Sequence, residues 1–301
     1  MQPCAALIEN FQTTNIQQVE SLKIFFLVLQ VTYFLQCGQM KSVKNTLKNL
    51  QHYVQSLSGR VENENEIVLS QNPLENFQWL NKDHLGILVY LLTIVHSVQT
   101  GSYEKAQKLI EKAMVNIQKC KLKEQTLNSQ SFTTYNSSFI TNAFHYMFLE
   151  NMIRCNITVG NRSQAIRQIG DLFQICDTDS RLMNSFSPQL HCLVGIYCLS
   201  MNLKEQALSH FNHSLKSTLD TDLWLFNAMN SAICYLNSMS SNHNIKNQLL
   251  TIMENLMPEN IQTQNSALTA VSHFFRALRF YLNGNYQQAK YIFIKKSIDI
   301  T

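Results

Sequence analysis

Histidine and cysteine side chains can hold a metal ion, and a cysteine thiolate can act as a nucleophile. His210 and His213 lie three residues apart, which would place both imidazoles on one face of a helix, the arrangement from which helical zinc sites are built. The sequence has no H-E-x-x-H motif, and no second pair of ligands lies near these two histidines. We therefore interpret them as surface residues and predict no metal site and no bound cofactor.

The eight cysteines form no C-x-x-C pair, and most of them lie inside apolar runs. Such cysteines are typical small core residues of a protein in a reducing compartment. The sequence also lacks the G-x-x-x-x-G-K-[ST] phosphate loop, the dinucleotide-binding G-x-G-x-x-G motif and the G-x-S-x-G nucleophile elbow. Because no nucleophile and base are brought together by any motif, we predict that the protein is not an enzyme.

The composition indicates a helical protein of moderate charge. The 301 residues are 45% hydrophobic and include only four prolines and eight glycines, so long helices are favoured over a turn-rich β architecture. A net charge of +4 creates no strong field for nucleic acid, and we expect no direct sequence-specific contact with it. The most apolar run, residues 22–37, contains Lys23, Gln30 and Gln36 and is too short to span a membrane. We therefore expect an all-α protein with no membrane partner.

A spaced pattern of small and aromatic residues recurs along the chain. In GSYEKAQKLIEKA (101–113), glycine is followed by tyrosine two residues later and by alanine five and twelve residues later. GNYQQAKYIF (284–293) repeats the glycine, the tyrosine and the first alanine, and weaker versions begin at residues 38, 160 and 202. The five starts are separated by 63, 59, 42 and 82 residues. These separations indicate a unit of about 40 residues with insertions.

This spacing is typical of the tetratricopeptide helix-turn-helix. Glycine between two helices permits positive φ, the aromatic residue packs over the turn, and alanine lets the second helix lie close to the first. We predict a single all-α, tetratricopeptide-like solenoid over residues 1–301, with about six helical hairpins wound into a right-handed superhelix. The residues predicted to pack the repeats are Gly38, Gly101, Tyr103, Ala106, Ala113, Gly160, Ala165, Gly195, Ala207, Gly284, Tyr286 and Ala289. The alternative is a set of generic helical hairpins, whose turns and interfaces favour the same residue types.

The first helix of a hairpin differs from the second. Residues 105–112 of a second helix mix lysine, glutamine and glutamate with apolar residues, whereas residues 85–98 of the first helix are apolar almost all round and must be covered on every side. First helices line the concave surface of tetratricopeptide arrays, so we expect a groove that holds an extended, partly apolar peptide of a partner. Its predicted residues are Phe25, Val28, Leu88, Leu91, Val95, Val98, Met147, Ile196, Leu199, Phe274, Leu278 and Tyr281. Burial of these residues by neighbouring repeats is the alternative.

Four segments of the chain resemble the tetratricopeptide subunit of the cohesin loader, a sister-chromatid cohesion factor. They are residues 25–51, 88–108, 190–202 and 280–290, and the similarity runs in order from Phe11 to Ile294. It extends beyond the repeat motif to NPLENFQWLNKDH (72–84) and to Leu223 and Trp224. Members of this family are longer. We therefore expect the chain to be incomplete at both ends relative to them, before residue 20 and after residue 301.

The resemblance implies a function and partners. In that family the solenoid wraps an extended N-terminal segment of a Nipped-B type large subunit, and the pair loads ring-shaped cohesin onto chromatin. The implied protein is a non-catalytic scaffold that binds the Nipped-B type subunit directly and cohesin and chromatin indirectly, in the nucleus and also in the cytoplasm. The alternative is a generic tetratricopeptide adaptor that binds short peptides as a co-chaperone does. The apolar stripe argues against it, because such clamps present lysine, arginine and asparagine.

We expect the isolated chain to self-associate. The sequence ends in YIFIKKSIDIT (291–301), within the second helix of a hairpin, and a repeat array without a polar terminal repeat leaves one apolar face exposed. Sedimentation at micromolar concentration should therefore show dimers or larger species. A monodisperse monomer would contradict the expectation.

Overall fold

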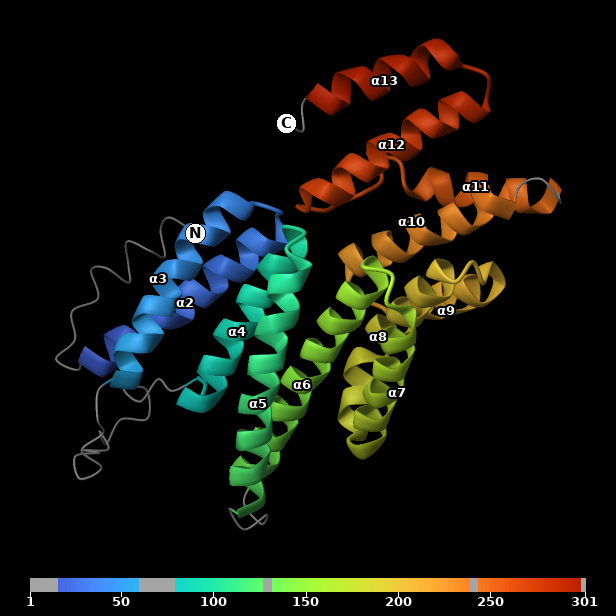
Figure 1. Ribbon diagram of the computed structural model, residues 1–301. Helices are drawn as coiled ribbons and strands as arrows, with labels where there is room; N and C mark the ends of the chain where they lie inside the picture. Colours follow the sequence, from blue (N-terminus) through green and yellow to red (C-terminus); the bar gives the residue numbers. More distant parts are fainter. Residues whose placement is uncertain (1–15, 60–78, 127–131, 239–242, 299–301) are drawn as a thin grey trace. The chain divides into compact units, whose positions relative to one another are not determined.

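The computed structural model describes residues 16–59, 79–126, 132–238 and 243–298 (Figure 1). These residues form twelve α-helices and no β-strand, which confirms the predicted all-α class. Consecutive helices follow one another as pairs, with a short turn inside most pairs. This arrangement is consistent with a tetratricopeptide-like helical solenoid.

The chain divides into two compact units, Met1–Cys155 and Asn156–Thr301, and each is described by itself. Unit 1 contains α2 (Ile16–Gln36), α3 (Met40–Gly59), α4 (Lys82–Gln99), α5 (Tyr103–Thr126) and most of α6 (Phe132–Thr158). Unit 2 contains the end of α6, followed by α7 (Arg162–Thr178), α8 (Ser180–Ser200), α9 (Lys204–Ser217), α10 (Thr221–Ser238), α11 (His243–Asn255), α12 (Ser266–Leu282) and α13 (Tyr286–Ile298). The single continuous solenoid and its right-handed winding stay predictions.

Five of the helix pairs are joined by the same tight turn. The central residue of each turn has positive φ, namely Gly38 (75°), Gly101 (74°), Gly160 (83°), Asn202 (61°) and Gly284 (79°). Glycine adopts this left-handed conformation without a steric cost, and asparagine is one of the few other residues that visits it routinely. The pattern found in the sequence therefore corresponds to one backbone conformation used five times.

The α4–α5 turn shows how each turn is held. The Gly101 N–H donates to the Val98 carbonyl (3.0 Å) and the Ser102 N–H donates to the Ser97 carbonyl (2.8 Å), which satisfies carbonyls at the end of α4. The Ala106 N–H then donates to the Ser102 carbonyl (3.0 Å) and begins the hydrogen bonding of α5. The equivalent three bonds form at the other four turns. The backbone hydrogen bonds of the turn therefore fix the position of the residue five places after the turn centre, which is Ala106 in this hairpin.

Small residues lie where the paired helices contact each other. The alanines of the repeat pattern are all buried, at Ala106, Ala113, Ala165, Ala207 and Ala289. Tyr103 is half-buried against the unit 1 core, whereas Tyr286 is exposed and its ring centroid lies 5.3 Å from that of Tyr281. At Gly195 of α8, a Cβ atom would lie 2.5 Å from the Phe211 ring of α9. The close approach of α8 to α9 therefore requires glycine at this position.

The cores are built from three successive helices at a time. In unit 1, α2, α3 and α4 enclose one cluster that includes Val31 and Leu50, and α4, α5 and α6 enclose a second that includes Ile94 and Phe148. Helix α4 contributes to both clusters, so each hairpin is stabilised by the next one. In unit 2, α10, α11 and α12 surround a third cluster centred on leucine and methionine side chains.

Two glycine-to-alanine substitutions inside helices test the close packing of α8 against α9. Gly195→Ala should lower the free energy of unfolding by about 1–3 kcal/mol, because the new methyl group must displace the buried Phe211 ring. Gly86→Ala in α4 is the matched control, since no atom outside the adjoining backbone lies within 4 Å of its Cβ position, and it should raise stability by about 1 kcal/mol. Urea unfolding measures both. A gain in stability for both variants would contradict the tight α8–α9 contact.

Candidate partner-binding surface

The predicted groove residues of α4 and α6 lie at the edge of the unit 1 cores. Leu88, Val95 and Val98 of α4 and Met147 of α6 are half-buried, and all four pack against the cluster formed by α4, α5 and α6. Leu88 and Val95 also contact the cluster formed by α2, α3 and α4. These side chains support the cores and still present part of their apolar surface to solvent.

Two other predicted groove residues of unit 1 are buried inside its cores. Val28 of α2 is 6% exposed and Leu91 of α4 is 8% exposed. Phe25, by contrast, is half-buried, and its ring contacts Trp79 edge-on with centroids 5.2 Å apart. Val28 and Leu91 therefore act as packing residues in this unit, while Phe25 lies nearer to its surface.

The predicted residues of unit 2 are more unequal in exposure. Ile196 and Leu199 of α8 are half-buried against the small cluster around the buried Phe211. Leu278 of α12 packs partly against the cluster of α10, α11 and α12. Two residues of the same helix are exposed, Phe274 at 48% and Tyr281 at 55%. The half-buried predicted residues of unit 2 thus belong to two different clusters, and their contact with a partner stays a prediction.

The exposed aromatic residues of α12 are paired with aromatic residues of α13. The ring centroids of Phe274 and Phe293 lie 5.6 Å apart, and those of Tyr281 and Tyr286 lie 5.3 Å apart, both in edge-on geometry. Tyr291 is also exposed on α13. Exposed apolar side chains that contact one another mark surfaces at which proteins associate. The α12–α13 hairpin therefore carries the most aromatic part of the described surface of unit 2.

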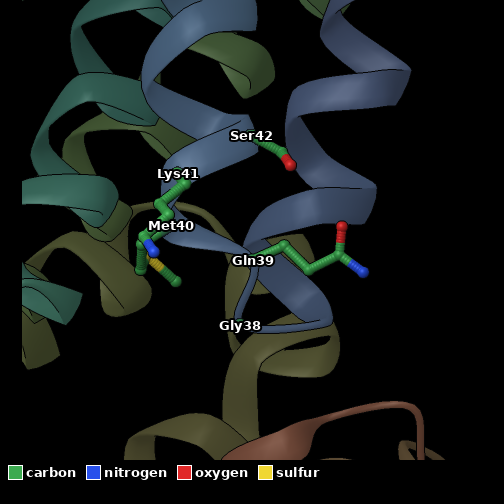
Figure 2. Close-up of a pocket in the computed structure, with 5 residues that line it drawn as sticks. All are labelled: Gly38, Gln39, Met40, Lys41 and Ser42. Atoms are coloured by element: carbon green, nitrogen blue, oxygen red, sulfur yellow. The ribbon is translucent and has the colours of Figure 1, made fainter. Parts of the chain in front are cut away.

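An open depression of about 430 Å³ lies at the turn between α2 and α3 (Figure 2). It is lined by five consecutive residues, Gly38, Gln39, Met40, Lys41 and Ser42. None of these residues belongs to the predicted groove, and the depression faces solvent at the end of a hairpin. It is too open to enclose a small molecule.

A buried polar network links the three helices of the second unit 1 core. The Thr141 hydroxyl of α6 donates to Glu124 Oε1 of α5 (2.7 Å), so it must accept its 2.8 Å bond from His84 Nε2–H of α4. Ser137 donates to the same glutamate oxygen (2.7 Å). Burial lowers the pKa of His84, and the negative charges of Glu124 and Asp83 only partly oppose this effect. The imidazole is thereby kept neutral and fixed in the Nε2–H tautomer.

A second polar contact of unit 1 pairs a lysine with a neutral histidine. Lys121 Nζ of α5 lies 3.0 Å from His145 Nδ1 of α6. Burial, and then the positive charge of Lys121, lower the pKa of His145 to about 4. Burial also lowers the pKa of Lys121. The neutral imidazole therefore accepts a hydrogen bond from the ammonium group, and the contact joins α5 to α6.

The histidines of unit 2 form a cluster that the sequence only partly indicated. His210 Nδ1 lies 3.0 Å from His191 Nδ1 of α8, and the His213 ring centroid is 4.1 Å from that of His191. His213 is exposed and His210 is half-buried. Burial and the two neighbouring imidazoles lower the pKa of His191. Within the described ranges, no group of three histidine, cysteine or acidic residues is placed to hold a metal ion.

The described cysteines belong to the cores. All seven are buried, at Cys37, Cys120, Cys155, Cys176, Cys192, Cys198 and Cys234. Burial raises the pKa of the Cys120, Cys155 and Cys176 thiols, which disfavours the reactive thiolate.

Among the described helices, none combines the length and the apolar character that a membrane span requires.

The sequence did not single out His84, Thr141 or His191. The available indication was a polar residue within an otherwise apolar helix, as in HLGILVYLL (84–92) or FITNAF (139–144). A buried polar residue needs a partner. Its partner lies too far along the chain to be identified from spacing, because His84 and Thr141 are 57 residues apart.

Comparisons with known proteins place these features in a family. Residues 2–301 match the family model described as cohesin loading factor. The chain is 36% identical over 279 residues to each MAU2 chromatid cohesion factor homolog of Drosophila virilis, Drosophila melanogaster and Aedes aegypti. Each match covers 92% of this chain and 42% of the relative, so the chain spans less than half the length of these relatives. No solved structure matches the chain.

Stability should fall as the pH decreases from 6.5 to about 4. In the folded chain His145 stays neutral down to its pKa of about 4, whereas in the unfolded chain it takes up a proton near 6.5. The unfolded state thus binds more protons in this window, so stability is fully present above pH 6.5 and is lost as the pH falls. Burial also lowers the pKa of His84, so this residue contributes to the loss in the same direction.

Urea unfolding at several pH values measures this loss, which should reach at most about 3 kcal/mol for His145. His145→Gln should flatten the pH dependence, and His52→Gln, at an exposed position of α3, serves as the control. Equal pH profiles for His145→Gln and the unmodified chain would contradict the assignment.

Proposed function

The chain belongs to the cohesin loading factor family, and from this membership we propose that it is a non-catalytic scaffold that binds an extended segment of a Nipped-B type partner. Through that partner it helps to load cohesin onto chromatin for sister-chromatid cohesion. It acts in the nucleus, in association with chromatin, with a second pool in the cytoplasm. The match of the family model to residues 2–301 is the observation that carries this proposal.

The half-buried apolar residues of the first helices support a binding role. Leu88, Val95 and Val98 of α4 each keep part of their surface outside the core. An extended peptide laid across α4 would cover these side chains, and burial of apolar surface would stabilise the complex by about 25 cal/mol per Å². A small polar ligand would gain nothing from this surface. The apolar stripe therefore favours a partly apolar peptide segment.

The buried polar groups support a scaffold over an enzyme. His84 is 2% exposed and Thr141 is fully buried, and both are hydrogen-bonded within the network that joins α4, α5 and α6. A general base must reach its substrate directly or through one water molecule. These side chains have no such access, so their hydrogen bonds serve the fold of unit 1.

A pair of glutamate substitutions tests the binding surface. Val95→Glu places a carboxylate at a partly exposed position, where the free chain can hydrate it, so it should destabilise the fold much less than a charge at a fully buried position. In the complex the partner would bury that carboxylate, and binding should weaken by about 100-fold. Ala106→Glu is the packing control, because Ala106 is fully buried and a charge there should unfold the hairpin. Circular-dichroism melts and pull-down of the N-terminal segment of the Nipped-B type partner give the two readouts.

The possible outcomes distinguish the alternatives. If Val95→Glu melts as early as Ala106→Glu, the stripe is ordinary core and the proposed surface is wrong. If Val95→Glu folds and binds the segment normally, the partner contacts another face. Recovery of chaperones from cell extract in place of the Nipped-B type partner and cohesin would favour the generic adaptor.

A further inference from the structure

Six exposed lysines occupy equivalent places on two second helices of unit 1. Helix α3 carries Lys41, Lys44 and Lys48, and helix α5 carries Lys105, Lys108 and Lys112. In each helix the spacing is i, i+3 and i+7, which places the three ammonium groups along one face over about 10 Å of the helix axis. The two triplets begin three and four residues after the glycine of their own turn. The same short stretch of each helix is therefore basic.

These lysines are not neutralised by the rest of the described chain. None of the six forms a salt bridge with a carboxylate that the structure describes. Helix α3 contains no aspartate or glutamate at all. In α5, Glu104 and Glu111 lie among the lysines, yet the helix holds six lysines against three glutamates. The mild net charge of the whole chain thus conceals a basic face, and α3 is its least compensated part.

The turns and cores of unit 1 bring the two triplets into proximity. Helix α4 shares one core with α3 and another with α5. The Gln51 side chain of α3 also donates a hydrogen bond to the Thr93 hydroxyl of α4 (3.1 Å). The positive charges of Lys105 and Lys44 both lower the pKa of His96 of α4, after burial, which lowers it most. Both ammonium groups therefore lie within electrostatic range of one imidazole. Figure 2 shows Lys41 beside the open depression at the start of α3.

The lysine face lacks the features of a protein-binding hot spot. No large apolar residue of α3 is exposed within its described side chains, and those exposed on α5, Val115 and Leu122, lie beyond its lysine triplet. Protein interfaces draw most of their affinity from buried aromatic or apolar anchors. Lysine acts as a flexible point charge without the bidentate geometry of arginine. A repeated row of such charges suits a long, uniform polyanion better than a folded or peptide partner.

We propose that the lysine face of α3 and α5 binds the phosphate backbone of duplex DNA without reading its sequence. Duplex DNA carries about one negative charge per 1.7 Å of axis, so neighbouring phosphates can meet each lysine of a triplet. No exposed phenylalanine, tyrosine or tryptophan lies among the described side chains of α3 or of the α5 triplet, so single strands, which need stacking platforms, fit less well. This contact lies on second helices. It goes beyond the proposed function, which relies on the first helices and reaches chromatin only through the partner.

The test is fluorescence anisotropy of the whole chain with a short labelled duplex at several salt concentrations. Six phosphate contacts predict a loss of affinity of about 1,000-fold between 50 and 200 mM salt. The triple variant Lys41→Gln, Lys44→Gln and Lys48→Gln should bind at least about 10-fold more weakly at 50 mM salt and lose only about 40-fold over the same range. Its melting temperature should be unchanged, because all three side chains are exposed.

A charge-matched control separates the face from the net charge. Arg167→Gln, Lys216→Gln and Lys290→Gln remove the same charge from exposed positions of unit 2, and they should leave affinity and salt dependence unchanged. Equal losses in the two triple variants, or no loss in the α3 variant, would overturn the proposal. Tighter binding of polyglutamate than of duplex DNA at the same salt would also overturn it, in favour of an acidic protein segment. Failure of this test would leave binding of the Nipped-B type segment unaffected.

Discussion

The left-handed turn is the constraint on which both units depend. In each of five turns one residue at positive φ lets two successive N–H groups bond back to carbonyls of the preceding helix, and the next helix begins at once. The direction of the second helix is therefore determined by the backbone of the turn. The residue five positions after the positive-φ residue lies at the interface between the two helices. Its side chain must therefore be small. Alanine fills this place four times and Val43 once, all of them buried.

This locality explains which features the sequence could predict. Each of these turns is encoded within six residues, so the glycine and the small residue five positions later were enough to locate most of the five hairpins. Asn202 was found only as a weaker match, yet it adopts the same left-handed conformation as the glycines (φ 61°). The exposure of the apolar stripe was less predictable. Val28 and Phe274 both lie ten residues before the glycine of their turn, yet Val28 is 6% exposed and Phe274 is 48% exposed. Burial depends on contacts between hairpins, which residue spacing does not specify.

The partners of buried polar groups also could not be predicted from residue spacing. These groups connect successive hairpins. In unit 1 the His84, Glu124 and Thr141 network joins α4, α5 and α6. In unit 2 the Ser214 hydroxyl of α9 donates to the Pro188 carbonyl of α8 and accepts from Asn227 of α10. Each network thus ties a hairpin to the first helix of the next one. A sliding of one hairpin along another would leave these groups buried without partners, which costs more than the loss of apolar contact alone. We infer that the networks fix the register in which successive hairpins pack.

In the proposed function, the first helices would combine this packing role with partner binding. Leu88 and Val95 contact two cores at once, one shared with α2 and α3 and the other with α5 and α6. A peptide that covers their remaining surface would therefore touch the junction between consecutive hairpins, and its binding energy would oppose their separation. Stability in a repeat array is a sum of hairpin terms and interface terms, so a ligand that bridges an interface adds to the interface term. Apolar residues at such junctions are consequently suited to bind a long segment that runs across several hairpins.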